Sequence, residues 1–159
     1  MNKIIDVKNI DSLSNQFAND KQRKVLVGGC FDIIHIGHIK FLTRAKALGD
    51  KLIVALESDG NVRRLKGDRR PINSQDDRAQ ILAHIGEVDF ILKLPDMNNF
   101  DEYKLMVEKI KPDIIALTAE DKYSEQKREQ AQMIGALFKI IDKFETYSTS
   151  KLAQILGLD

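Results

Sequence analysis

Short apolar runs bounded by polar segments recur along the chain. Each run is rich in Val, Ile or Leu, which is typical of strands that are covered on both faces of a sheet. The pattern predicts strands at residues 24–27, 51–56, 88–92, 113–117 and 136–141.

Between these runs the apolar residues have helical spacing. Gly49 and Pro112 stand where two of these segments end, as helix-terminating residues commonly do. Ser74, followed by Asp76 and Asp77, supplies the cap and the acidic first turn of a helix start. We therefore predict helices at residues 39–48, 74–85, 101–110 and 123–134.

Strands that alternate with helices predict an α/β fold with a doubly wound parallel sheet in a single domain. Residues 1–20 are expected to form a short amphipathic helix, with Leu13 and Phe17 as its apolar pair. This gives an N-terminal helical extension at 1–20 and the main domain at 21–159. Doubly wound sheets bind ligands at the carboxyl ends of their strands, so the site is expected there.

Composition limits the classes of partner. The chain has 159 residues, of which 43% are hydrophobic and 31% charged, an ordinary globular balance with enough length for a full core. A net charge of +1 predicts no general affinity for nucleic acid, so any attraction for phosphate must be local. The single cysteine, Cys30, excludes an internal disulfide and a thiolate metal cluster. We find no apolar run of membrane-spanning length and no secretory signal, and expect a soluble cytoplasmic protein without a membrane partner.

The most informative segment follows the strand at 24–27 and reads GGCFDIIHIGH at residues 28–38. His35 and His38 stand where a strand turns into a helix, and their spacing makes them face the same way from the first helical turn. Free N–H groups at a helix start attract phosphate. We expect the backbone near Cys30 and Phe31 to hold an α-phosphate, while both imidazoles donate to oxygens that gain negative charge in the transition state.

Two glycines of this segment suit a nucleotide. Gly29 lets a ligand approach the backbone closely, and Gly37 is expected to leave room for a flat nucleoside against the helix. The alternative interpretation makes His35 and His38 surface or capping residues. Their spacing after a glycine turn, at a strand-to-helix junction, favours the functional interpretation. His84 is expected to be a packed or surface histidine.

Positive charges gather in residues 61–70, and Gly67 with Pro71 predicts a mobile loop in the second half of that region. Such a run is usually a solvated face. Here it follows the second strand, from which a loop can reach the same sheet edge as His35. This placement favours a phosphate-binding role for part of the run.

Hydroxyl side chains gather near the C-terminus. Ser148, Thr149 and Ser150 are expected to cap a helix and also to bind the β- and γ-phosphates of a nucleotide. The apolar face of that helix is Leu152, Ile155 and Leu156.

Asp32 has several interpretations, which the sequence leaves open. It can orient a histidine, help to hold Mg²⁺, or serve as a turn residue.

Three ordered motifs resemble those of the cytidylyltransferase-like nucleotidyltransferases, Rossmann-type proteins that join an NTP to a phosphorylated alcohol or sugar. The first is the H-x-G-H signature at 35–38. The second, RLKGDRRP at 64–71 followed by Arg78, resembles the adenylyltransferase half of the bifunctional heptose enzymes of lipopolysaccharide synthesis. The third is TYSTS at 146–150, and the resemblance spans roughly residues 20–155.

The resemblance implies a role for each site residue. His35, His38 and Lys66 are the implied catalytic residues, and Mg²⁺ is implied to neutralise the triphosphate. Arg70 is expected to close over the phosphates and Arg78 to support them. Lys143 stands where the family has an arginine, and keeps its charge without bidentate geometry. The implied nucleotide-binding set is Gly29, Cys30, Phe31, Gly37, Arg70, Arg78, Lys143, Ser148, Thr149 and Ser150.

The implied reaction joins an NMP from an NTP to a phosphorylated small-molecule acceptor and releases pyrophosphate. The leading pair is ATP with D-glycero-D-manno-heptose 1-phosphate, giving ADP-heptose, because residues 64–71 match that branch best. A separate sugar kinase is then expected upstream. The second interpretation is a cytidylyltransferase for glycerol 3-phosphate or a similar polyol phosphate, and the third is a nucleotide-binding regulatory module without turnover. The resemblance also implies a homo-oligomer.

One segment departs from the family pattern. Heptose enzymes commonly have Lys-Gly-Gly-Asp-Tyr after the fourth strand, and glycerol-phosphate relatives have Gly-Asp-Asp, whereas residues 118–123 here read TAEDKY. Asp121 keeps the acidic position, but Ala119 and Glu120 are expected to narrow the site. The charge of Glu120 is unfavourable beside a phosphorylated substrate unless it faces away or meets a metal. This segment is the reason to keep the interpretation as a nucleotide-binding regulatory module without turnover.

Overall fold

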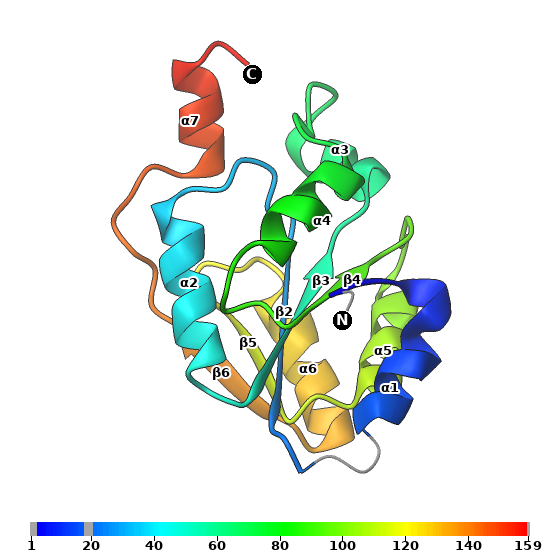
Figure 1. The fold of residues 1–159 in the computed structure, drawn as a ribbon. Coiled ribbons are helices and arrows are strands. Elements are labelled where there is room, and N and C mark those ends of the chain that lie inside the picture. Colours follow the sequence, from blue (N-terminus) through cyan, green and yellow to red (C-terminus); the bar gives the residue numbers. More distant parts are fainter. Residues whose placement is uncertain (1–2, 18–20, 159) are drawn as a thin grey trace.

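The computed structural model describes residues 3–17 and 21–158 (Figure 1). Within these ranges, six strands form one parallel sheet in the order β1-β4-β3-β2-β5-β6. The predicted single α/β domain with a parallel sheet is thereby confirmed. The strands are β1 (Ile4–Asp6), β2 (Lys24–Gly29), β3 (Lys51–Leu56), β4 (Phe90–Lys93), β5 (Ile114–Thr118) and β6 (Leu137–Ile141).

Helices cover both faces of the sheet (Figure 1). Helices α2 (Ile36–Lys46) and α4 (Gln75–Ala83) contribute side chains to one hydrophobic core. The other core takes side chains from α1 (Ile10–Phe17), α5 (Phe100–Ile110) and α6 (Ser124–Ile134). The sheet is therefore doubly wound, as predicted.

Each central strand serves both cores, because successive side chains of a strand point to opposite faces. In β2, Val25 and Val27 belong to the core under α2 and α4, while Leu26 belongs to the core under α1, α5 and α6. All three side chains are buried. Burial on both faces explains why this strand appears in the sequence as a continuous apolar run.

Two elements were not predicted from the sequence. The first is β1, whose residues pair with β4 at Ile4 and Ile91; three residues are too few to show a pattern. The second is α3 (Asp59–Lys66), which is highly polar and buries only Asn61 and Val62. Local capping starts this helix, because Ser58 Oγ accepts a hydrogen bond from the Asn61 N–H.

Of the helix expected at residues 1–20, the structure has α1 with Leu13 fully buried, whereas residues 4–6 form β1 instead. The side chain of Phe17, its expected apolar partner, lies outside the described residues. A short 3-10 turn, η1 (Val7–Asn9), joins β1 to α1. The boundary between the extension at 1–20 and the domain at 21–159 stays a prediction.

The chain order places a crevice at the centre of the sheet. From β2 the chain builds outward through β3 to β4, and then returns to place β5 on the opposite side of β2. Where the order reverses, the connections from β2 and β5 lead to opposite directions and leave a crevice at the carboxyl ends of these strands. The segment at 28–38 lies at this point.

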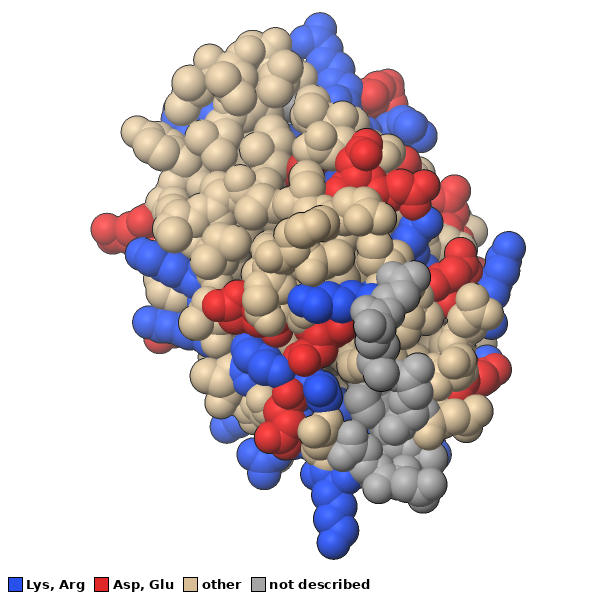
Figure 2. Space-filling view, in the orientation of Figure 1, with Lys and Arg blue, Asp and Glu red and all other residues tan. Residues whose placement is uncertain are grey.

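The last helix, α7 (Thr149–Ile155), lies beyond the start of α2, at the upper left of Figure 1. Ala153 is buried, but Ile155 and Leu156 of the expected apolar face are 60% and 63% exposed. Figure 2 shows few charged side chains over this part of the molecule. Among the described residues, no helix combines the length and apolar character needed to cross a membrane.

Candidate active site

A pocket of about 400 Å³ opens at the carboxyl ends of β2 and β5. Its walls come from the segment at 28–38, the end of α3, the end of β5 and the segment before α7. The structure therefore brings together motifs that are far apart in the sequence. The predicted site residues that line this pocket are Gly29, Cys30, Phe31, Asp32, His35, Gly37, His38, Lys66, Arg70, Lys143, Ser148, Thr149 and Ser150.

His35 and His38 lie side by side at the start of α2, with ring centroids 3.9 Å apart. His35 Nδ1 accepts a hydrogen bond from the Gly37 N–H at 3.1 Å, and His38 Nδ1 accepts one from the His35 N–H at 3.4 Å. The pair forms a capping box in which two histidines replace the usual Ser and Glu. Capping and a place in the pocket, which the sequence presented as alternatives, thus occur together.

These contacts fix where each imidazole carries its proton. Because Nδ1 of both rings accepts from a backbone N–H, the proton of each neutral ring is on Nε2. Burial, with a smaller contribution from His35, lowers the pKa of His38 to about 4; burial also lowers the pKa of His35. Both rings are neutral at pH 7, and each offers an Nε2–H donor instead of a positive charge.

The turn after β2 is shaped by packing within the protein. Phe31 has a φ of 46°, and its buried ring lies 5.2 Å from the His38 ring, centroid to centroid. A Cβ at Gly29 would lie 2.8 Å from Phe31 Cε2, so a side chain there would displace the ring. Burial raises the pKa of the Cys30 thiol, which is therefore protonated at pH 7. The turn is preorganised, with its residues lining the pocket.

Gly37 allows two segments to approach each other. A Cβ at this position would lie 2.6 Å from Thr146 Cγ2 and 2.9 Å from His35 Cε1. The space expected for a nucleoside is therefore occupied by protein atoms at this point. The glycine instead lets the segment before α7 pack against the start of α2.

Asp32 anchors a loop to the histidine motif. Its buried carboxylate accepts hydrogen bonds from Arg70 Nε at 2.6 Å and from the N–H groups of Ile72 and Asn73 at 2.9 Å. Burial raises the pKa of Asp32, but the hydrogen bonds from Asn73, Ile72 and Arg70 outweigh it and lower the pKa below its usual value. Of the open interpretations, the turn residue fits these contacts. The loop expected to be mobile is fixed at Arg70, which is only 3% exposed.

Arg78 lies outside the pocket, contrary to its expected place beside the triphosphate. Its fully buried guanidinium donates to the Cys30 carbonyl at 2.5 Å, to Asp59 Oδ1 at 2.7 Å and to the Asn73 carbonyl at 3.1 Å. The side chain ties the turn after β2 to α3 and to the loop before α4. Arg78 therefore supports the pocket from behind.

Two lysines present positive charge to the pocket. Lys66, the last residue of α3, is exposed and forms no ion pair within the described part of the chain. Lys143 is paired with Glu120, so the acidic side chain that the sequence flagged as unfavourable has its charge balanced. Asp121 is likewise paired, with Lys127 Nζ at 2.6 Å.

The hydroxyl residues before α7 connect it to the histidine motif. Ser148 Oγ accepts a hydrogen bond from the Lys151 N–H at 3.1 Å and caps the helix, as expected. Thr149 Oγ1 donates to the Ile33 carbonyl at 3.1 Å. These bonds hold the Ser148–Ser150 wall of the pocket close to His35.

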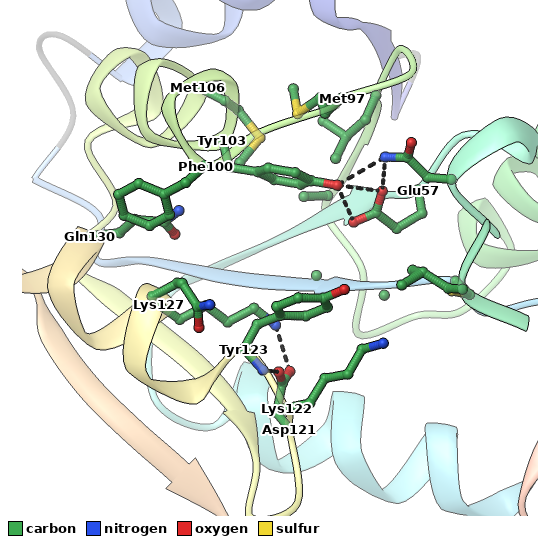
Figure 3. A pocket seen from close by; sticks show the side chains of 18 of the residues that line it. Glu57, Met97, Phe100, Tyr103, Met106, Asp121, Lys122, Tyr123, Lys127 and Gln130 are labelled. Carbon is green, nitrogen blue, oxygen red and sulfur yellow. Dashed lines mark hydrogen bonds and ion pairs between the residues drawn. The ribbon is translucent and has the colours of Figure 1, made fainter.

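A second, larger pocket of about 870 Å³ adjoins the first. It extends from the turn after β2 between α3 on one side and α5 and α6 on the other (Figure 3). Around it stand Glu57, Tyr103 and Lys127, none of which was a predicted site residue. The residues that line both pockets are Gly28, Gly29, Cys30, Lys66, Glu120 and Asp121.

Only part of the larger pocket had a signal in the sequence. Glu57 directly follows β3, and residues at the carboxyl ends of parallel strands are candidates for ligand binding. Asn61 and Tyr103 lie within helices, where polar residues are common, so nothing in their spacing marked them.

The described residues offer no metal site of their own. None of their His, Cys, Asp and Glu side chains form a group of three or more suited to a metal ion. Asp32, the one candidate ligand, already uses both carboxylate oxygens within the protein. Asp32 is therefore not available as a ligand for Mg²⁺.

Comparison with known proteins agrees with the motifs. The family model described as Cytidylyltransferase-like matches residues 26–155. Bifunctional protein HldE of Campylobacter concisus is 44% identical over 120 residues, which cover 75% of this chain and 25% of that protein. Bifunctional protein HldE of a Nitratiruptor species is 38% identical over 151 residues, or 95% of this chain and 31% of that protein. The chain thus spans about a quarter to a third of the length of these relatives.

Solved structures share the architecture. The lipopolysaccharide core biosynthesis protein from Thermoplasma volcanium has a TM-score of 0.63 and 28% identity, covering 79% of this chain and 99% of that one. Pantoate-beta-alanine ligase from Francisella tularensis has a TM-score of 0.60 at 19% identity, covering 92% and 68%, and shares the fold alone. With the family match across most of the chain and the histidine motif at the centre of the sheet, this chain belongs to the cytidylyltransferase-like family.

Proposed function

We propose that this chain transfers a nucleotidyl group from an NTP to a phosphorylated sugar or alcohol. An oxygen of the acceptor phosphate attacks the α-phosphorus, a new P–O bond forms, the bond to the β-phosphate breaks, and pyrophosphate leaves. The observation that carries this proposal is the meeting of two pockets at the turn after β2, beside two neutral imidazole donors. One pocket would take the NTP and the other the acceptor.

In this proposal the smaller pocket binds the triphosphate. The Nε2–H groups of His35 and His38 donate to the oxygens around the α-phosphate, where negative charge grows in the transition state. Lys66 stands between the pockets and balances charge on both substrates, while Lys143 and the segment Ser148–Ser150 lie on the side of the distal phosphates.

No general base is required, because the acceptor phosphate is already ionised at neutral pH. Catalysis then consists of positioning and charge stabilisation. Arg70 and Arg78 act as positioning residues that hold the loop and the turn. Mg²⁺ would accompany the triphosphate as part of the substrate and would neutralise part of its charge.

ATP and D-glycero-D-manno-heptose 1-phosphate are the proposed substrates, with ADP-heptose as product. The resemblance of residues 64–71 to the heptose branch, the HldE relatives and the similarity to a lipopolysaccharide core biosynthesis protein support this choice. A sugar kinase reaction must supply such an acceptor. We also propose that the protein acts as a homo-oligomer in the cytoplasm, where nucleoside triphosphates are available.

A pyrophosphate-release panel tests the proposal. ATP and CTP are each combined with heptose 1-phosphate, other sugar 1-phosphates and glycerol 3-phosphate. The proposal expects the highest kcat/KM for ATP with heptose 1-phosphate. Preference for CTP with glycerol 3-phosphate would favour the cytidylyltransferase interpretation, and no release from any pair would favour a binding module without turnover.

A further inference from the structure

The larger pocket holds a network of polar side chains that the transfer step itself does not use. Tyr103 Oη lies 3.0 and 3.1 Å from the two carboxylate oxygens of Glu57, to which it donates. The Asn61 amide donates to Glu57 at 2.8 Å and to Tyr103 Oη at 2.9 Å. Figure 3 shows Tyr103 and Glu57 meeting at one wall of the pocket. Two neutral donors thus hold one carboxylate in place.

The network is fixed by neighbouring elements. Asn61 is 3% exposed, and its side-chain oxygen accepts from Arg64. Arg64 also donates to the Met97 carbonyl at 2.9 Å and to Asn98 Oδ1 at 2.8 Å. The orientation of the Asn61 amide is therefore set by α3 and the segment before α5, so the amide can only present its N–H groups to Glu57.

Glu57 differs from the other carboxylates of this pocket in its hydrogen-bond and ion-pair partners. Among the described residues, no Lys or Arg forms an ion pair with it, in contrast to Glu120 and Asp121 in the same pocket. A carboxylate has about four lone-pair sites, of which the two neutral donors fill only some. Burial, and next the Glu57 charge, raise the pKa of Tyr103, so the phenol stays a donor. The remaining capacity of Glu57 suits neutral O–H donors.

A second polar group lines the same pocket. Gln130 is 6% exposed, and its side-chain amide has no hydrogen-bond partner within the described residues. No buried side-chain nitrogen or oxygen of the described residues lacks a partner, so the unpaired amide atoms of Gln130 are open to the pocket, where a ligand or water can bind them. An amide can both donate to and accept from a hydroxyl group.

The larger pocket has a positive side chain at one end and a negative one at another wall. Lys66 lies where the two pockets join, whereas Glu57 lies on the wall formed by β3 and α3. An acceptor phosphate is attracted to the first position and repelled from the second. The neutral end of an acceptor is therefore the part that can reach Glu57.

We propose that Glu57, Tyr103 and Asn61, with Gln130, recognise hydroxyl groups on the carbon chain of the acceptor. The acceptor is then a polyhydroxylated phosphate whose phosphate faces Lys66 and whose hydroxyl-bearing end faces Glu57. This inference rests on the proposed function for the reaction at the phosphate, and adds the residues that choose the acceptor. Glu57 is the specificity-determining residue, because its carboxylate has free acceptor capacity and no ion-pair partner among the described residues.

The test is Glu57→Gln, with Glu129→Gln as the matched control on an exposed part of α6. Initial rates are measured with ATP and either heptose 1-phosphate or analogues that each lack one hydroxyl. We expect Glu57→Gln to lower kcat/KM for heptose 1-phosphate by about tenfold to a hundredfold, the loss typical of a hydrogen bond to a charged group. The KM for ATP should stay unchanged. For at least one deoxy analogue, which lacks the hydroxyl that Glu57 recognises, kcat/KM should be the same in the variant as in the wild type. Tyr103→Phe should act in the same direction, by about tenfold or less.

Several outcomes would overturn the inference. The same kcat/KM for heptose 1-phosphate in Glu57→Gln and Glu129→Gln would do so. So would a Glu57→Gln variant that lowers kcat/KM by the same factor for heptose 1-phosphate and for every deoxy analogue. If no pair releases pyrophosphate, the proposed transfer fails, and calorimetric binding of heptose 1-phosphate decides the inference separately. Binding that Glu57→Gln abolishes supports hydroxyl recognition; equal binding, or binding to neither protein, overturns it.

Discussion

Two adjacent histidines give this pocket both its shape and its donors. His35 and His38 use Nδ1 to satisfy backbone N–H groups at the start of α2, which leaves Nε2–H on each ring for a ligand. A Ser and Glu capping box would satisfy the same N–H groups but would bring a negative charge to a phosphate site. Neutral imidazoles combine capping with hydrogen-bond donation and add no repulsion.

The variant His38→Ala tests the catalytic half of this arrangement. We expect kcat to fall by about two to three powers of ten, as for the loss of one donor aimed at developing negative charge. The fold should persist, because the ring fills only one cap position. Stopped-time assays of pyrophosphate release measure the effect, with His84→Ala, which alters an exposed histidine, as control. A kcat close to that of the wild type would show that His38 does not stabilise the transition state.

Stability should depend on pH through the same rings. Their pKa values are lowered in the folded chain from the usual value of 6.5, to about 4 for His38, so from pH 6.5 downwards the unfolded chain binds protons that the folded chain does not. The free energy of unfolding is therefore full above pH 6.5 and falls towards pH 4, by about 1.4 kcal/mol per pH unit for His38. Asp32, whose pKa is also lowered, begins to lose its contribution as the pH falls through the usual carboxyl value of 3.8, and loses it fully below its own lowered pKa.

Urea denaturation at pH 7, 6 and 5 measures this dependence. The slope should be smaller in His38→Ala than in the wild type. A wild-type stability that is constant between pH 7 and 5 would contradict the assigned protonation of the two rings.

At the residue scale, the sequence predicted most of the smaller pocket. The histidine signature, the glycine turn and the Ser148–Ser150 cluster are local patterns, each contained in a short stretch of the chain, so one sequence suffices to find them. Arg78 was expected in the pocket because a motif records which residue recurs and not which way it points. Its three hydrogen bonds depend on tertiary contacts that no spacing reveals.

At the element scale, the pocket is built from loops that are tied to one another. Asp32 holds the loop at 70–73, Thr149 holds α7 to the Ile33 carbonyl, and Arg78 holds the turn after β2 to α3. Preorganisation of this kind reduces the entropy lost when a ligand binds.

Arg78→Ala tests that architecture. Because the variant leaves the Cys30 and Asn73 carbonyls without their buried donor, and Asp59 without its partner, we expect a loss of about 3 kcal/mol in the free energy of unfolding. Urea denaturation measures it, and Arg69→Ala, an exposed neighbour on the loop, should change stability by no more than about 0.5 kcal/mol. Wild-type stability combined with a raised KM for ATP would instead indicate direct contact with the triphosphate.

The elements that the sequence missed share a physical cause. Apolar periodicity reports burial, and α3 buries too few apolar side chains to produce it, while β1 is too short. Burial can also mislead: Val88 is fully buried but precedes β4, so the predicted strand began two residues early.

At the scale of the molecule, function follows from the order of the strands. The reversal between β3 and β5 on either side of β2 opens the crevice, and the two pockets meet at its centre. Alternating apolar runs were enough to predict the sheet, because parallel strands buried on both faces require such runs. Most of the larger pocket was not predictable, since its wall combines scattered residues of β3, α3, α5 and α6.

Adjoining pockets imply direct transfer between two substrates that are bound together. The most direct test is to measure pyrophosphate release with ATP alone and then with ATP plus heptose 1-phosphate, at enzyme concentrations high enough to detect one turnover. The account predicts no release from ATP alone, and steady release with intersecting initial-rate lines when both substrates are varied. A burst of pyrophosphate equal to the enzyme concentration without acceptor would show a covalent nucleotidyl intermediate and contradict it.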